Sequence, residues 1–141
     1  VFRGLEGDKI IVDLIASSSL TPEIFLVYVL VTVFVAGFFI DFIEIIFIVV
    51  PVITPILVAL DIDLIWVGIM LAINLQTSFL SPPFGFSLFY LKSVSPKDVK
   101  TMDIYKGVLP FVLIQLLFLL YLFLNPDFIY IVPELISGYK S

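Results

Sequence analysis

The sequence predicts an all-α integral membrane protein. Of its 141 residues, 62% are hydrophobic and only 13% are charged, and the mean hydropathy is +1.25. Soluble domains usually carry about 45–50% apolar and about 25% charged residues, so this composition indicates helices that lie in a bilayer. The chain contains no cysteine and no histidine, which excludes disulfides, thiolate chemistry and histidine metal sites within it. The absence of a basic stripe argues against nucleic-acid binding.

The longest apolar run, residues 24–60, predicts a re-entrant helical hairpin. A spanning helix needs about 20 residues, so the run is long enough for two spans. Its only candidate corner, Gly37–Asp41, lacks the Asn, Lys or Ser of a water-exposed loop. We therefore expect the tip of the hairpin to stop at membrane depth. Pro51 and Pro55 are expected to bend the return arm, and Thr54 to hydrogen-bond back to a carbonyl that they free.

Two carboxylates lie near this tip. Asp41 and Glu44 are three residues apart, which places both on one face of a helix. Charged groups at membrane depth are costly, so they usually face a cavity or the protein interior. The alternative is that both lie near the interface and are simply solvated.

Residues 74–85 interrupt the next apolar run with amides, hydroxyls, two adjacent prolines and a glycine. The prolines remove two backbone donors, so helix 64–91 should unwind near Ser78–Pro83 and restart around Phe84. Inside a bilayer, unwound backbone is tolerated only where it is buried in protein or lines a wet cavity. Freed carbonyls beside hydroxyls suit a small hard cation. The alternative is a proline kink that packs against its neighbours.

The flanking segments set the expected topology. Residues 1–23 mix charged and apolar positions and predict an interfacial or linking segment, which ends in a helix-start signal at Thr21 and Pro22. Residues 92–106 hold four of the seven basic residues, which places this loop in the cytoplasm.

The last part of the chain predicts one further span. Residues 107–124 read as a transmembrane helix, and by alternation the tail 125–141 lies on the periplasmic side. We expect Gln115, within the span, to hydrogen-bond to another helix. Trp66, near the start of helix 64–91, suits an interfacial position.

Several strings resemble the large membrane subunit of TRAP (tripartite ATP-independent periplasmic) transporters, in the branch that handles mannitol or chloroaromatic compounds. They are Gly37-Phe-Phe-Ile-Asp-Phe-Ile-Glu-Ile45, the spacing Pro51-x-x-x-Pro55, and Asn74-Leu-Gln-Thr-Ser-Phe-Leu-Ser-Pro-Pro-Phe-Gly-Phe-Ser-Leu-Phe-Tyr90. The resemblance covers nearly the whole chain. Other members carry Thr where Ser81 stands here, and Ser keeps the hydroxyl.

The resemblance implies the C-terminal part of a permease, half of an inverted-repeat, elevator-type secondary transporter in the bacterial inner membrane. It implies sodium symport of an organic anion, typically a carboxylate, with Na⁺ as the coupling ion and no other cofactor. The implied partners are a small membrane subunit and a periplasmic substrate-binding protein. With the first repeat absent, this chain alone is not expected to transport.

The resemblance, together with the physical arguments above, indicates an Na⁺ site and a substrate site. The expected Na⁺-binding residues come from the tip and the break: Gly37, Phe38, Asp41, Asn74, Thr77, Ser78 and Ser81. The helix that restarts near Phe84 presents backbone N–H groups, whose positive end favours a carboxylate. The expected substrate-binding residues are therefore Ser81, Pro82, Pro83, Phe84 and Gly85, with Gly85 allowing close approach.

Two other classes of function remain open at this stage. A membrane scaffold or assembly subunit would use residues 74–85 only as a kink. An intramembrane enzyme would use Asp41 and Glu44 as paired carboxylates, although catalytic acids at depth normally need partners from other helices. Alanine at Thr77 and Ser81 separates a scaffold from an ion site, and Asp41→Asn would silence only the enzyme.

Overall fold

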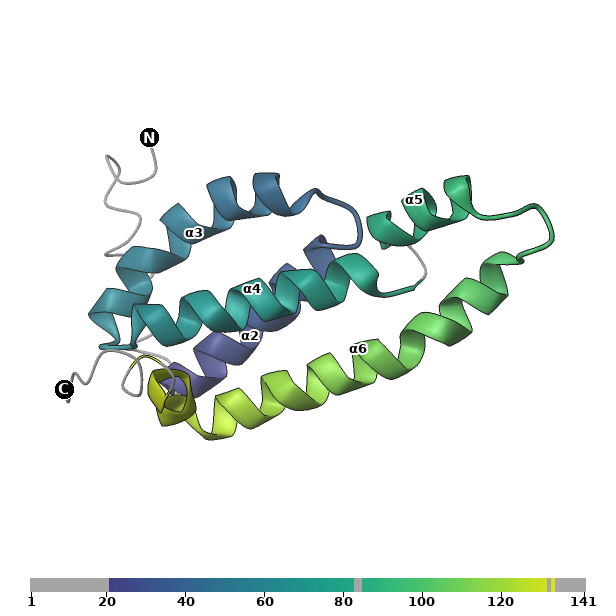
Figure 1. The fold of residues 1–141 in the computed structure, drawn as a ribbon. Helices are drawn as coiled ribbons and strands as arrows, with labels where there is room; N and C mark the ends of the chain where they lie inside the picture. The colour runs from purple at the N-terminus through teal and green to yellow at the C-terminus, as the bar shows by residue number, and fades with distance from the viewer. Residues whose placement is uncertain (1–20, 83–84, 132, 134–141) are drawn as a thin grey trace.

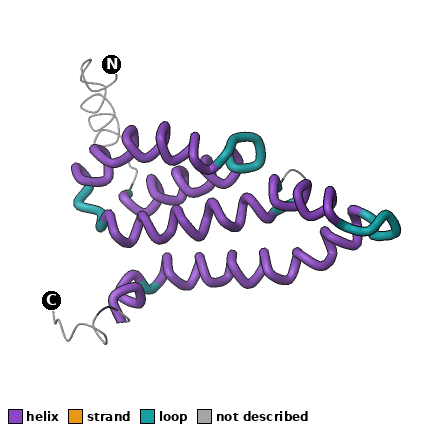
Figure 2. Tube along the Cα trace, turned by 45° about the horizontal axis from the view of Figure 1, so that its top comes forward, coloured by secondary structure: helices purple, strands orange, loops and turns teal. Residues whose placement is uncertain are grey.

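The computed structural model describes residues 21–82, 85–131 and 133. Within these residues the fold is entirely helical (Figures 1 and 2). The elements are α2 (Pro22–Ala36), α3 (Phe42–Ala59), α4 (Leu64–Leu80), α5 (Phe86–Val94), α6 (Thr101–Leu124) and the 3-10 helix η2 (Pro126–Tyr130). Most of the expected interfacial segment 1–23, Pro83, Phe84 and most of the end of the tail lie outside the described residues.

Helix α4 is the centre of the arrangement. It packs against α2, α3, α5 and α6 (Figure 1). Helices α2 and α3 form an antiparallel hairpin beside it, and α6 runs back along its other side. Figure 1 shows α5 and the turn that follows it extending beyond the tip of the hairpin. The buried core between these helices includes Leu26, Val33, Leu57, Val67 and Met70.

Short polar residues start three of the helices. Thr21, Asp41 and Asp63 each accept a hydrogen bond from a backbone N–H in the first turn of the helix that follows. Such caps satisfy amide groups that have no partner inside the helix. The predicted helix start at Thr21, with Pro22 in the first helical position, is confirmed.

Helix α3 continues through both of its prolines. The Thr54 hydroxyl donates to the Val50 carbonyl oxygen at 2.6 Å. A proline frees the carbonyl one turn before it, which for Pro51 and Pro55 means Phe47 and Pro51 itself. The prediction that Thr54 bonds to a freed carbonyl is therefore wrong. Its hydroxyl makes the ordinary bond to the preceding turn of its own helix.

Helix α6 begins at Thr101, before the Gly107 at which the span was expected to start. Asp103 accepts a hydrogen bond from the Lys100 backbone N–H at 3.0 Å, which caps this earlier start. The expected helix–helix hydrogen bond of Gln115 is not made among the described residues, because its buried Oε1 has no partner there.

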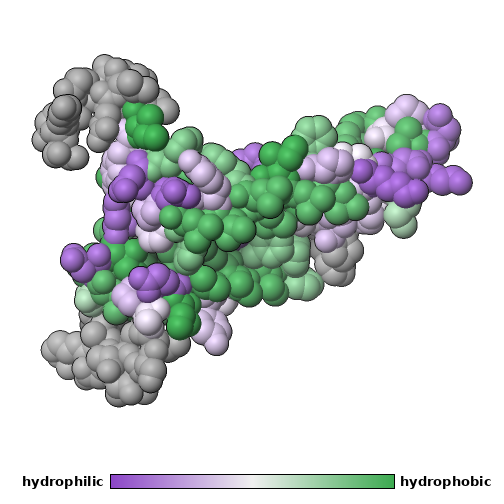
Figure 3. Space-filling model, turned by 90° about the horizontal axis from the view of Figure 1, so that it is seen from below, coloured by the Kyte–Doolittle hydropathy of each residue, from purple (hydrophilic) through white to green (hydrophobic). Residues whose placement is uncertain are grey.

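Two helices of the described part are long and apolar enough to cross a membrane, α3 and α6. Figure 3 shows hydrophobic residues covering the middle of one face of the molecule, with hydrophilic residues gathered towards its two ends. This distribution fits helices that cross or enter an apolar layer.

Candidate functional site

The tip of the hairpin lies directly against the end of α4. Gly37 is buried, and a Cβ added to it would lie 3.0 Å from the Ser78 Cβ and closer still to the Ser78 Oγ. Its φ of −64° is open to any residue. Gly37 is therefore required for space and not for its conformational freedom.

A pair of buried polar side chains ties α4 to α2. The Asn74 Nδ2 donates to the Leu30 carbonyl oxygen at 2.8 Å, and the Ser78 Oγ donates to the Phe34 carbonyl oxygen at 2.6 Å. Asn74 and Ser78 lie one turn apart and share a face of α4. The Phe34 carbonyl needs this partner, because the N–H of Phe38 turns to a different carbonyl where α2 ends. Polar groups buried in this way must be paired.

The interruption of the long helix begins where the sequence predicted it, since α4 ends at Leu80 and α5 begins at Phe86. Two buried hydroxyls line its first side. Thr77 donates to the Ile73 carbonyl at 2.7 Å, and Ser81 donates to the Thr77 carbonyl at 2.8 Å. Each hydroxyl uses its hydrogen in this bond, so its lone pairs stay available to accept a hydrogen bond or bind a cation.

On the second side of the interruption, the backbone of Gly85 closely approaches the backbone at the end of α4. A Cβ on Gly85 would lie 2.6 Å from the Phe79 carbonyl oxygen and 2.8 Å from that of Ser81. Gly85 was expected to let a ligand approach, whereas the space beside it is taken by α4 itself. The Ser87 hydroxyl donates to the Phe79 carbonyl at 2.7 Å. Helix α5 then starts with no side-chain cap, which leaves N–H groups at its positive end.

The hairpin tip meets the end of α4 and the interruption that follows it, at a place here called the junction. The structure brings five predicted cation-site residues to this junction: Gly37, Asn74, Thr77, Ser78 and Ser81. Asp41 lies at the tip but is exposed, and it caps α3 through the Ile43 N–H at 3.0 Å. Glu44 is also exposed. The half-buried Pro82 lies in the interruption, and the predicted contacts of Pro83 and Phe84 lie outside the described residues.

The backbone oxygens of the junction differ in their availability. No hydrogen bond from the described residues reaches the carbonyl of Gly37 or Phe38. The carbonyls of Thr77, Ser78 and Ser81 already accept one bond each. A carbonyl has two lone pairs, so these three keep one for a ligand. The two tip carbonyls and the hydroxyl oxygens are the freest oxygens there.

Sequence reasoning missed the two acceptors on α2, Leu30 and Phe34. The one-turn spacing of Asn74 and Ser78 was a usable signal that one face of α4 is polar. Nothing in the apolar sequence of α2 marks the carbonyls that this face would meet.

A second polar cluster ties the other end of α4 to the end of the chain. The Tyr130 hydroxyl donates to Asp63, and the Trp66 Nε1 donates to the Leu122 carbonyl at 3.0 Å. Burial alone would raise the pKa of Asp63, but hydrogen bonds from Tyr130 and from the N–H groups of Ile65 and Trp66 outweigh it, and the pKa is lowered. The same bond to Asp63 raises the pKa of Tyr130. This cluster fixes α4 against α6.

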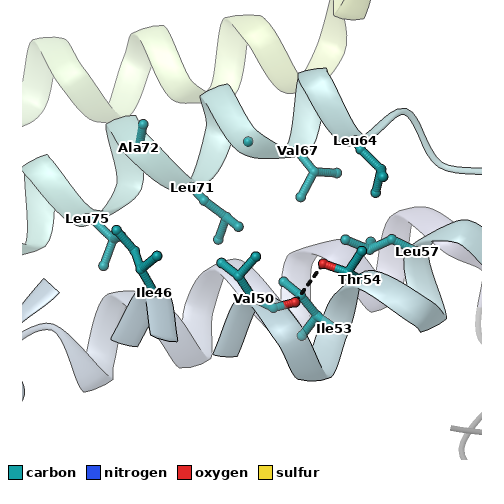
Figure 4. A pocket seen from close by; sticks show the side chains of 11 residues that line it. Ile46, Val50, Ile53, Thr54, Leu57, Leu64, Val67, Leu71, Ala72 and Leu75 are labelled. Atoms are coloured by element: carbon teal, nitrogen blue, oxygen red, sulfur yellow. Dashed lines mark hydrogen bonds between the residues drawn. The ribbon is translucent and has the colours of Figure 1, made fainter. Parts of the chain in front are cut away.

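A groove of about 310 Å³ runs between α3 and α4 (Figure 4). Thr54 is the only polar side chain among its lining residues, and its hydroxyl is bonded to Val50. The groove therefore offers an apolar surface with a single hydroxyl oxygen, whereas a hard cation takes several oxygen ligands.

Comparison with known proteins identifies the family. Residues 4–128 match the family model of the tripartite ATP-independent periplasmic transporter, DctM component. The chain is 32% identical over 126 residues to the sialic acid TRAP transporter permease protein SiaT of Haemophilus influenzae, covering 89% of this chain and 20% of that protein.

Two relatives from Vibrio cholerae extend the comparison. The C4-dicarboxylate TRAP transporter large permease protein DctM is 32% identical over 130 residues, which cover 92% of this chain and 28% of that protein. The sialic acid TRAP transporter large permease protein SiaM is 28% identical over 131 residues, covering 93% and 30%. The chain thus spans less than a third of the length of these relatives. It belongs to the DctM family, the large permease component of tripartite ATP-independent periplasmic transporters.

Proposed function

We propose that this chain forms one half-site of a permease that couples Na⁺ to the import of an organic anion. The observation that carries the proposal is the junction between the hairpin tip and the interrupted helix. Gly37 packs on Ser78 there, and buried hydroxyls and the buried Asn74 amide lie in the same turns of α4. A membrane protein keeps polar groups and irregular backbone at depth mainly where they line a site.

In this proposal Na⁺ binds at the junction. The carbonyls of Gly37 and Phe38 supply oxygens from the tip, and Thr77, Ser78 and Ser81 supply oxygens from α4. Asn74 holds α4 against α2, and Asp41 adds a nearby negative charge. Oxygen ligands of this kind suit a hard cation.

The anion binds beside the cation, at the start of α5. The uncapped N–H groups of that helix form a positive end, which favours a carboxylate. Ser81 lies between the two sites, because its carbonyl accepts the Gly85 N–H at 3.0 Å. The proposed anion contacts are Ser81, Pro82, Pro83 and Phe84, while the Gly85 N–H is already used in the bond to Ser81.

The short α2 favours a re-entrant hairpin and, with it, an elevator-type half-repeat, while the other arm, α3, is long enough to cross a membrane. Helix α2 has 15 residues, or roughly 22 Å at about 1.5 Å per residue, which is short for a hydrocarbon core of about 30 Å. Helix α6 has 24 residues and is roughly 36 Å long, long enough to span. The four lysines of residues 92–106 put that loop in the cytoplasm and the C-terminus in the periplasm.

The proposed setting is the bacterial inner membrane, with a small membrane subunit and a periplasmic binding protein as partners. The relatives named above carry the names of sialic acid and C4-dicarboxylates, and we propose an organic acid for this chain too. Assignment to the branch for mannitol or chloroaromatic compounds rests on the resemblance of residues 37–90 alone.

The test is sodium-dependent uptake in vesicles that hold the complete transporter. Alanine at both Thr77 and Ser81 should raise the half-saturating Na⁺ concentration at least several-fold, because two of the ligand oxygens are lost. The matched control is Thr54→Ala. Thr54 makes the same bond to the preceding turn but lies in α3, away from the junction, and its loss should leave Na⁺ dependence unchanged.

Uptake indifferent to Na⁺ and to both substitutions would refute the ion site and leave a scaffold role for the junction. If Asp41→Asn abolished uptake while alanine at Thr77 and Ser81 had no effect, the alternative function as an intramembrane enzyme would be favoured. In the described residues Asp41 caps α3, which already gives it a structural task.

A further inference from the structure

Helix α4 carries a polar side chain, Gln76, on a face that the proposed site does not use. Gln76 lies between Asn74 and Ser78 in the sequence and points to the opposite side of the helix, because adjacent helical residues are about 100° apart. Its side chain is exposed. No residue of the described part hydrogen-bonds to its amide, which contrasts with the paired Asn74 and Ser78.

Gln76 lines a cavity, here called the amide cup, of about 330 Å³ between α3 and α4. Its lining residues are Phe42, Ile46, Ala72, Leu75, Gln76 and Phe79. The rings of Phe42 and Phe79 meet edge to face, with centroids 6.0 Å apart. A small concave site with aromatic walls and one amide is typical of a site for a small organic molecule.

Phe79 connects the amide cup to the interruption. Its ring forms one wall of the cup, while its carbonyl accepts the Ser87 hydroxyl from the first turn of α5. Phe42 directly follows the tip residue Asp41. The cup therefore adjoins both the hairpin tip and the uncapped start of α5.

An exposed amide inside a largely apolar helix needs a partner in a membrane, because leaving it unpaired in hydrocarbon costs free energy. A molecule bound in the cup would supply one. The Gln76 amide is neutral, and it both donates and accepts. It suits a hydroxyl, a carbonyl or a second carboxylate of the solute, while the aromatic walls suit a carbon skeleton.

We propose that Gln76 is a specificity-determining residue that hydrogen-bonds to a polar oxygen of the transported organic acid, at the end remote from the carboxylate held by α5. The inference rests on the proposed function and adds the residue that recognises a second polar oxygen, beyond the first carboxylate, in the transported acid. Sialic acid and succinate both carry such an oxygen and serve as probes.

The first test is the reactivity of Gln76→Cys in the complete transporter, with any cysteines outside this chain replaced. This chain has no cysteine of its own, so the new thiol reports only on position 76. A water-soluble, membrane-impermeant thiosulfonate should modify it, and Na⁺ with sialic acid or succinate should slow the modification at least tenfold. Ile48→Cys, on the exposed apolar side of α3, should not be modified.

The second test is the kinetics of Gln76→Leu. Its KM for the transported probe should rise roughly three- to tenfold, the size expected for one lost hydrogen bond, with the half-saturating Na⁺ concentration unchanged. An unreactive Gln76→Cys overturns the inference, and so does a reactive one that neither probe protects. In either case, uptake that still depends on Na⁺ through Thr77 and Ser81 would leave the proposed function standing.

Discussion

Replacing Gly37 with alanine is the sharpest test of the contact between tip and interruption. The new methyl group would lie 3.0 Å from the Ser78 Cβ, nearer still to its Oγ, and 3.4 Å from the Val33 carbonyl oxygen. The backbone at Gly37 has φ −64° and ψ −9°, so alanine is not strained in itself. The whole effect should come from overlap with Ser78.

The magnitude follows from two terms. Overpacking of a tight contact costs typically about 1–3 kcal/mol. Turning the Ser78 hydroxyl aside to relieve the overlap gives up its bond to Phe34, worth about 1 kcal/mol. A loss of about 2–4 kcal/mol is therefore expected. Gly68 is the matched control, because a Cβ there meets nothing within 4 Å; alanine should stabilise that helix by about 0.5–1 kcal/mol.

The assay is equilibrium unfolding of the complete permease in mixed micelles, followed by far-ultraviolet circular dichroism. The double variant Gly37→Ala with Ser78→Ala should lose less free energy of unfolding than the two single variants together. The overlapping hydroxyl is then gone, and the effects of substitutions at contacting residues are not additive. The reasoning is refuted if Gly37→Ala is as harmless as Gly68→Ala, or if the double variant is simply additive.

Two predictions concern the other end of α4. Trp66→Phe should destabilise the fold by about 1 kcal/mol in the same unfolding assay, because it removes the 3.0 Å bond to Leu122. The lowered pKa of Asp63 gives stability that is present above the ordinary value of 3.8 and is lost as the pH falls through the folded value. Tyr130→Phe removes one of the bonds that lower this pKa, so acid unfolding titrations of the variant should show a smaller stabilisation, lost at a higher pH.

Local chemistry made the ends of the helices predictable. The two prolines beside Ser81 stop α4, and a threonine before a proline starts α2, because each effect acts within one turn of the residue that causes it. The start of α6 was missed because the basic residues of 92–106 suggested a loop. The Asp103 carboxylate instead accepts the Lys100 backbone N–H and caps a helix that begins before the apolar segment.

Contacts between helices could not be read in the same way. After Glu23, helix α2 carries only Tyr28 and Thr32 among apolar residues, so no polar periodicity shows which of its carbonyls meet Asn74 and Ser78. The acceptor at Phe34 exists only because α2 ends there and its last turn changes hydrogen-bond partners. Gln115 shows the converse, since a polar residue expected to bind a neighbouring helix has no partner among the described residues.

The two faces of α4 explain how one helix could couple an ion to a solute. Asn74 and Ser78 hold α4 against α2, which places Ser78 beside the tip residue Gly37. A ligand shifts a conformational equilibrium only through its differential affinity for the two states. Na⁺ bound to both the tip and α4 would therefore favour the joined arrangement, in which Phe42 meets Phe79 and the amide cup beside Gln76 is complete. Coupling then needs no contact between Na⁺ and solute, only their shared dependence on the closed tip.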